Sequence, residues 1–237
     1  MPSISFEHVT VDFDGHTVLS DVDLELTEPR IGVIGPNGCG KSTFARLING
    51  LGEPSSGRVT VDGLDTTRDG ARVRRQVGFI FSDADNQIVM PTVLDDVAFS
   101  LRRYKLPRAQ RRAKALAMLE RFGLAEHAEK SPHLLSGGQK QLLALAAVLI
   151  TEPEVIVTDE PTTLLDLRNR KLIKRVFDTL DQQLIVVSHD LELFDTTDRV
   201  IYLNDGRVRG DGPPSAIIPR YVREASGDGA GEGGVQP

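Results

Sequence analysis

The residues with the clearest chemical meaning form a glycine-rich stretch early in the chain. GPNGCGKST (35–43) follows the apolar run IGVI and precedes FARLING, which is typical of a helix. Glycines leave backbone N–H groups bare and a helix N-terminus adds partial positive charge, so the stretch suits the phosphates of ATP. We expect Lys41 to reach the β- and γ-phosphates and the Ser42 hydroxyl to bind Mg²⁺. The residues expected to contact ATP here are Gly35, Pro36, Asn37, Gly38, Cys39, Gly40, Lys41, Ser42 and Thr43.

Two carboxylates end another apolar run. Asp159 and Glu160 follow VIVT, at the carboxyl end of a strand, where open α/β sheets place their chemistry. One carboxylate can hold Mg²⁺ through water, and the next can orient and deprotonate an attacking water. Two acids in a solvated turn are the plainer interpretation. Beside a phosphate-binding loop, however, the pair favours a nucleotide hydrolase, with Asp159 near the metal and Glu160 as the base.

A third element begins at LSGGQKQLLALAAVLI (135–150). Ser136 and Gln139 form the pattern of a capping box, which opens a helix and needs no function. Gly137 and Gly138 inside that cap also leave N–H groups free for an anion. Two phosphate-binding elements nearly 100 residues apart therefore predict a composite site.

Strand-like and helix-like runs alternate along the chain, which predicts an α/β fold with a parallel central sheet. The N-terminal run alternates apolar and polar residues as antiparallel strands do, and the region 92–135 lacks clear strands and is expected to be a helical insertion. The expected strands are 4–13, 22–26, 31–35, 58–63, 77–81, 155–159, 184–188 and 199–203, and the expected helices are 42–50, 107–122, 137–151, 166–181 and 190–196.

Composition narrows the class of protein further. The net charge of −6 argues against non-specific nucleic-acid binding, although RRYKLPRAQRRAK (102–114) is a local basic patch that could face a membrane or a partner. The longest apolar run, 142–150, is too short to span a bilayer, and no signal peptide is visible. A single cysteine allows no intrachain disulfide. We expect a cytoplasmic protein with a disordered tail at 226–237.

With LSGGQ added to the phosphate loop, the sequence from about Ile4 to Pro214 closely resembles the ATP-binding cassette (ABC) family. The resemblance implies a P-loop core carrying an antiparallel N-terminal subdomain and a helical subdomain at about 92–150, all in one domain over 1–225. It also implies that two subunits pair head to tail, with each ATP between the loop 35–43 of one and Ser136–Gln139 of the other. Further roles are implied for Phe13, stacking on adenine; Asp166, pairing the protomers; and His189, contacting the γ-phosphate.

The stretch VGFIFSDADNQIVMPTV (77–93) points to one branch of that family. It resembles the segment of energy-coupling-factor importers that joins the ATP site to a transmembrane partner. Ser82 stands where the family has its first glutamine, so the metal contact could be made by Ser82 through a water, by Asp83 or by Gln87, and we favour Ser82. The residues expected to touch the partner are Gln87, Ile88, Val89 and Met90.

The resemblance implies an ATPase that drives a micronutrient importer from the cytoplasmic face of the membrane, without spanning it. Its partners would be a transmembrane coupling subunit, a small membrane substrate-binding subunit and a second ATPase chain, identical or paralogous. The compact C-terminus is similar to biotin transporters, and a cobalt or nickel importer ranks second. An ABC ATPase acting as an assembly scaffold stays open, whereas a small-molecule kinase would not require LSGGQ.

Overall fold

The structure, a computed structural model, describes residues 1–226. Its centre is a six-stranded sheet in the order β10-β9-β3-β8-β7-β6. The neighbouring pairs from β9 to β6 are parallel, and β10 adds an antiparallel edge. The strands are β3 (Arg30–Ile34), β6 (Val77–Ile80), β7 (Val155–Asp159), β8 (Gln183–Val187), β9 (Arg199–Asn204) and β10 (Arg207–Gly212).

Successive side chains of these strands enter two different hydrophobic cores, because neighbouring residues in a strand point to opposite faces. In β7, Val155 and Val157 join one core and Ile156 joins the other. All three are fully buried, which explains why the sequence of this strand is continuously apolar. The sheet is therefore covered on both faces.

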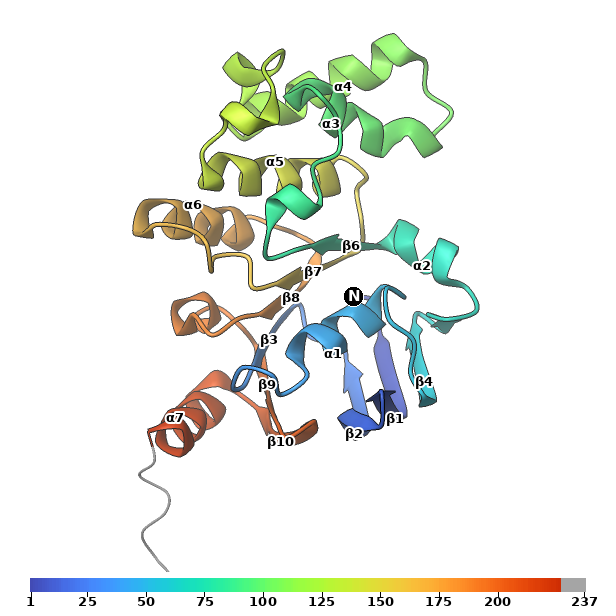
Figure 1. Ribbon diagram of the computed structural model, residues 1–237, viewed down its shortest axis with the longest axis vertical. Helices are drawn as coiled ribbons and strands as arrows, with labels where there is room; N and C mark the ends of the chain where they lie inside the picture. Colours follow the sequence, from blue (N-terminus) through green and yellow to red (C-terminus); the bar gives the residue numbers. More distant parts are fainter. Residues whose placement is uncertain (227–237) are drawn as a thin grey trace, which may run out of the picture.

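One face is covered by α1 (Lys41–Ile48) and by a second, antiparallel sheet in the order β2-β1-β4-β5 (Figure 1). Phe6 of the antiparallel sheet stacks on Phe44 of α1, with ring centroids 4.4 Å apart. The helix is thus held between the two sheets, which fixes the loop that precedes it. The strands are β1 (Ile4–Phe13), β2 (His16–Leu26), β4 (Ser56–Val61) and β5 (Leu64–Asp65).

The other face is covered by helices, and those nearest the top of Figure 1 form a cluster. Within it α3 (Val93–Ser100) packs against both α4 (Arg108–Arg121) and α5 (Gly137–Leu149). The remaining helices are α2 (Gly70–Gln76), α6 (Leu167–Asp178) and α7 (Pro214–Ala225), and short 3₁₀ turns include η1 (Ala84–Asn86), η2 (Leu101–Arg103) and η5 (Leu191–Phe194). No helix in residues 1–226 has the length and apolar character needed to cross a bilayer.

The α/β class, the parallel central sheet, the antiparallel N-terminal sheet and the helical region are confirmed. Several elements differ from expectation: β2 begins at His16 rather than residue 22, while α2, β10 and α7 were not expected. The expected helix 190–196 is only the short 3₁₀ turn η5, at whose start Asp190 accepts a hydrogen bond from the Glu192 backbone. The expected tail 226–237 lies outside the described residues except for Ser226.

Candidate functional site

The site lies where the parallel strands β3, β8 and β7 end side by side. The carboxyl ends of parallel strands meet at one edge of a sheet, so the loops that follow them converge. The glycine-rich loop follows β3, Glu160 follows β7, and His189 follows β8 with one residue between. Three segments that are far apart in the sequence thus reach a common place.

The loop between β3 and α1 is shaped by close backbone contacts that only glycine allows. A Cβ atom at Gly35 would lie 2.1 Å from the Leu203 carbonyl oxygen. At Gly40 a Cβ would lie 2.7 Å from the Val18 carbonyl oxygen, and its φ of 102° disfavours other residues. The Cys39 thiol faces inward, and burial raises its pKa, which marks it as a packing residue of the loop.

The Lys41 ammonium is held over this loop. Its Nζ donates to the carbonyl oxygens of Gly35 at 2.9 Å and Pro36 at 3.0 Å, and the residue is only 7% exposed. A lysine ammonium has three N–H donors, so one is left to meet an anion. The adjoining cavity, about 240 Å³, is lined by Val18, Asn37, Gly38, Gly40, Lys41, Ser42, Thr43 and Glu160.

Ser42 and Asp159 lie together at the floor of the site. The Ser42 hydroxyl donates to Asp159 Oδ1 at 2.8 Å. Burial raises the pKa of Asp159, and the hydrogen bond from Ser42 partly offsets that effect. Hydroxyl and carboxylate oxygens are ligands that Mg²⁺ accepts, so this pair fits a magnesium ion. Residues 1–226 contain no cluster of three or more His, Cys, Asp or Glu that could hold a metal ion.

Glu160 is held by groups from two loops. Its Oε2 accepts from His189 Nδ1 at 2.8 Å and from Thr163 Oγ1 at 3.0 Å. The Glu160 side chain is 16% exposed and that of His189 is 49% exposed, so the pair stands at the mouth of the site. The structure therefore brings together Lys41, Ser42, Asp159, Glu160 and His189. A carboxylate oriented in this way can receive a proton from a water near a phosphate.

The LSGGQ segment (135–139), called here the signature stretch, folds as predicted, but its residues do not line this cavity. Ser136 caps α5 by accepting from the Gln139 backbone N–H, and the Gln139 side chain accepts from the Ser136 N–H at 2.9 Å, which is the expected capping box. Gly138 is buried against Asn169 of α6, where a Cβ would lie 2.1 Å from that side chain. None of Ser136, Gly137, Gly138 and Gln139 is among the described residues that line the cavity beside Lys41.

Two further predicted residues lie on exposed edges. Phe13 ends β1 with 57% of its surface exposed and does not line the cavity either, although Val18 of the neighbouring strand does. Asp166 caps α6 by accepting from the Asn169 N–H at 2.8 Å. It is flanked by two large apolar residues, Leu164 and Leu167, that are 68% and 61% exposed. This apolar exposure around Asp166 is suited to contact with another chain.

The polar segment after β6 is folded back on itself. Asp83 caps η1, accepting from the Asp85 N–H at 2.9 Å, and Asp85 forms an ion pair with Lys140 of α5 at 2.7 Å. The Gln87 amide donates to the carbonyl oxygen of Phe79 in β6 and accepts from the N–H of Phe81, directly after β6, both at 3.4 Å. In the part of the chain that the structure describes, Ser82 is half-buried and its side chain makes no hydrogen bond.

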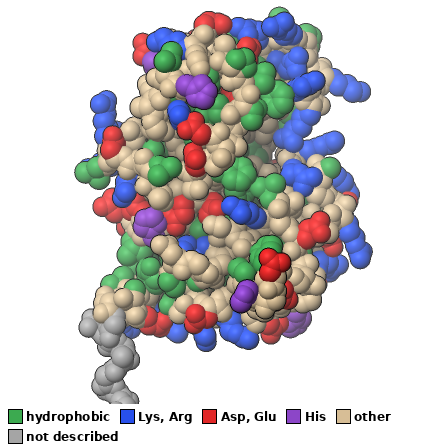
Figure 2. Space-filling model, viewed as in Figure 1, with side chains coloured by type: hydrophobic (Ala, Val, Ile, Leu, Met, Phe, Trp, Pro, Cys, Tyr) green, Lys and Arg blue, Asp and Glu red, His purple; other side chains and the backbone are tan. Residues whose placement is uncertain are grey.

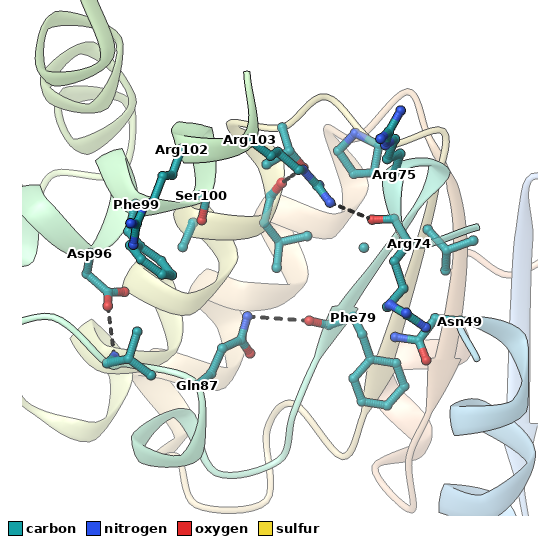
Figure 3. Close-up of a pocket in the computed structure, with 17 residues that line it drawn as sticks. Asn49, Arg74, Arg75, Phe79, Gln87, Asp96, Phe99, Ser100, Arg102 and Arg103 are labelled. Carbon is teal, nitrogen blue, oxygen red and sulfur yellow. Dashed lines mark hydrogen bonds between the residues drawn. The ribbon is translucent and has the colours of Figure 1, made fainter. Parts of the chain in front are cut away.

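A groove of about 680 Å³ lies beyond this segment, away from the phosphate loop (Figure 3). One wall comes from α2 and β6 with Arg74, Arg75 and Phe79, and the other comes from α3 and η2 with Phe99 and Arg102. Gln87 and Val89 of the predicted partner residues line this groove. The other two predicted residues do not line it. Met90 and Ile88 line smaller hollows beside it.

Asp96 supports the groove and was missed by sequence reasoning. It is 5% exposed, and its Oδ1 accepts from the backbone N–H groups of Val89 at 2.9 Å and Met90 at 3.0 Å. Burial raises its pKa. An aspartate in the first turn of a helix usually serves the helix dipole in solvent, so nothing local in TVLDDV signalled this role.

Comparison with known proteins agrees with this arrangement. The family model described as "ABC transporter" matches residues 19–163. The biotin transport ATP-binding protein BioM of Rhizobium etli is 46% identical over 219 residues, covering 92% of this chain and 97% of that protein. The energy-coupling factor transporter ATP-binding protein EcfA1 of Symbiobacterium thermophilum is 39% identical, covering 93% and 80%.

A solved structure extends the likeness to three dimensions. The dimeric post-hydrolysis structure of the ATP-binding cassette MJ0796, bound to ADP and Pi, superposes with a TM-score of 0.81 at 30% identity. It covers 89% of this chain and 98% of that one. Family model, relatives and fold agree on one conclusion: the chain belongs to the ABC transporter family, as one of its ATP-hydrolysing subunits.

Proposed function

We propose that this chain is the ATP-hydrolysing motor of an energy-coupling-factor importer for a micronutrient, with biotin as the favoured cargo. The energy-coupling and biotin assignments rest on the names of the relatives described above, at 39% and 46% identity over nearly the whole chain. The single observation that carries the motor role is the segment 81–90. It starts at the end of β6, next to β7 and its carboxylates, and ends at the 680 Å³ groove.

ATP would lie with its phosphates on residues 35–43 of one chain and Ser136–Gln139 of another. Residues 136–139 do not line the Lys41 cavity of their own chain, which supports this division, because those of a second chain would then be free to face it. The dimeric form of the structural relative supports it as well. Ser42 and Asp159 would hold Mg²⁺, which neutralises phosphate charge when bound. Phe13 would stack on adenine, and Asp166 would touch the facing chain.

Glu160 would act as the base. Its Oε2 is taken up by His189 and Thr163, so Oε1 would receive a proton from the attacking water as the water oxygen bonds to the γ-phosphorus and the bond to the β–γ bridging oxygen breaks. ADP and phosphate are the products. His189 holds Glu160 through Nδ1, so its Nε2 is on the opposite side of the ring, where it would contact a γ-phosphate oxygen. Ser82 would reach the attacking water or the metal through a water.

The groove would receive a cytoplasmic segment of the transmembrane coupling subunit, which in turn holds a small substrate-binding membrane protein. Residues 87–90 would make that contact, so the ATPase would sit on the cytoplasmic face of the membrane as a peripheral subunit. ATP-driven pairing would close two such chains, and hydrolysis would reopen them. The movement of the segment 81–90 would pass each step to the partner.

The test is to tag the chain in its own host, solubilise the membranes gently and identify what co-purifies. A transmembrane scaffold with a small hydrophobic protein carrying biotin is the expected result. The same complex carrying another vitamin, cobalt or nickel would correct the cargo alone. Recovery of only soluble proteins would contradict the importer and favour an assembly scaffold, while the ATPase assignment would stand.

A further inference from the structure

A hollow of about 360 Å³ next to the groove is lined by an unusual set of side chains. Four of its eight lining residues are arginines, namely Arg102, Arg108, Arg111 and Arg112. The hollow contains a single acid, Asp95, and Arg112 already pairs with it. The apolar lining is Met90, Ala98 and Phe99.

Three of the four arginines have no acidic partner. In the described residues, Arg102, Arg108 and Arg111 form no ion pair, whereas Arg112 bridges Asp95 and Glu129. Residues 97–119 contain seven Lys or Arg and no Asp or Glu. In a chain of net charge −6 this is a strong local reversal of sign, and the excess of positive charge attracts anions to this surface.

The hollow also offers apolar and aromatic surface at its rim. Phe99 is 41% exposed, with the Arg102 guanidinium 5.8 Å from its ring centroid, and Tyr104 nearby is 37% exposed. Basic side chains interleaved with partly exposed aromatic rings are typical of surfaces that meet the headgroup region of a bilayer. Figure 2 shows Lys and Arg gathered on the side of the molecule where α2, α3 and α4 lie.

The hollow is continuous with the groove. Arg102 and Phe99 line both, and Arg74, Arg75 and Arg103 border the groove on the same side. A partner embedded in the membrane and seated in the groove would bring the bilayer surface to this side. The choice of a lipid, rather than a soluble phosphate, therefore rests on the proposed function.

We propose that the hollow lined by Arg102, Arg108, Arg111 and Arg112 binds the phosphate of an anionic lipid headgroup. Guanidinium groups pair with phosphate oxygens in a planar, two-pronged geometry, which lysines do not reproduce. The site would orient the subunit on the inner surface of the membrane, with its acidic remainder turned away from the lipid. It adds an electrostatic contact to the protein–protein contact in the groove.

The experiment uses the full-length chain and vesicles that contain no protein. Vesicles of phosphatidylcholine alone are compared with vesicles in which about 30% of the lipid is phosphatidylglycerol. Binding is measured by co-sedimentation at low and at physiological salt. We expect binding only to the anionic vesicles, weakened by salt. The double variant Arg108→Gln/Arg111→Gln should reduce partitioning about 30-fold, since each charge near such a surface contributes roughly a factor of 5.

The matched control is Lys171→Gln/Arg175→Gln, which removes two exposed charges from α6 and should leave vesicle binding unchanged. Neither double variant should change ATPase activity in detergent, which also verifies folding. Equal binding to both vesicle types, or equal loss in both variants, would overturn the proposal.

Competitors separate the other sources of phosphate. Full displacement from vesicles by millimolar glycerol phosphate would show a site for soluble phosphate esters and contradict the lipid site. Tighter binding of single-stranded RNA, lost in the same variant, would assign the surface to nucleic acid instead. Co-purification of a membrane subunit with Arg108→Gln/Arg111→Gln is measured separately, so failure of the lipid site leaves the importer role standing.

Discussion

At the scale of single residues, the site depends on hydrogen bonds that hold each group in one orientation. Glu160 is the clearest case, because His189 and Thr163 both donate to the same carboxylate oxygen. Ser42 and Asp159 form a similar pair next to it. Two carboxylates adjacent in the sequence thus have different partners, which favours different roles: Asp159 at the metal and Glu160 at the water.

Glu160→Gln should slow turnover by a large factor and preserve ATP binding. The amide keeps the size of the side chain and an oxygen for His189 but cannot accept the proton of the attacking water. We expect kcat to fall by about 100-fold or more, and light scattering should detect an ATP-dependent dimer that persists. Glu154→Gln, at the opposite end of β7, is the control and should leave kcat unchanged. Wild-type turnover in Glu160→Gln would refute the base assignment.

The local structure of residues 35–43, 136–139 and 159–160 could be predicted from the sequence, because a glycine-rich loop, a helix cap and a strand end are each encoded by neighbouring residues. Residues 136–139 nevertheless do not line the cavity beside Lys41. The contacts of Asp96, Gln87 and the groove arginines were not readable. They depend on how α3 lies against β6 and α2, which no local pattern encodes. The Gln87 side chain, for example, bonds to the backbone of Phe81 and Phe79, which lie six and eight residues before it.

At the scale of elements, α3 and the chain before it are joined through Asp96. Its buried carboxylate accepts from two part-buried backbone N–H groups, those of Val89 and Met90. Leaving these donors unpaired would cost stability, because each is partly shielded from water and would lose its partner. The position of the predicted partner residues 87–90 therefore depends on a side chain six or seven residues later.

Asp96→Ala should lower the free energy of unfolding by about 2 kcal/mol, whereas Asp96→Asn should be close to neutral, because one oxygen accepts both bonds. Since burial raises the pKa of Asp96 in the folded state, ionisation of this group costs stability as pH rises above its ordinary value of 3.8. Asp96→Asn should therefore gain stability relative to wild type with rising pH. Urea unfolding at pH 4 and pH 7 measures both effects, and equal losses in the two variants would contradict them.

The elements themselves were predicted unevenly. The buried strands 155–159 and 184–188 were found because their continuous apolar character leaves little alternative. The helix α2 was missed because GARVRRQ is short and has no apolar stripe: three of its seven residues are arginines, and only Gly70 and Val73 are buried. The strand β10 is an edge strand with alternating partial exposure, so its sequence carries a weak signal.

At the scale of the whole molecule, Arg199 connects the two sheets. Its guanidinium donates to Asp211 at 2.6 and 2.7 Å within the central sheet, and to the Glu25 carbonyl oxygen of β2 at 2.7 Å. A second carboxylate, Glu28, accepts at 3.1 Å. One side chain therefore fixes the antiparallel sheet to the edge of the central sheet.

Arg199→Lys should destabilise the protein by about 1–2 kcal/mol, because an ammonium cannot make the paired contacts with Asp211 and also reach β2. For a chain of this size the melting temperature should fall by about 4 °C. Calorimetry provides the measurement, with Arg207→Lys, an exposed arginine of β10 without an ion pair in the described chain, as the control. An unchanged melting temperature would show that the link contributes nothing.

The two walls of the groove are tied by few bonds. Arg103 donates to the Arg74 carbonyl oxygen at 3.1 Å (Figure 3). Tyr104 donates to the Thr151 carbonyl oxygen at 3.0 Å. Each such bond contributes only about 1 kcal/mol. In the proposed importer, a partner bound in the groove would therefore change the width of the groove at a small cost in free energy.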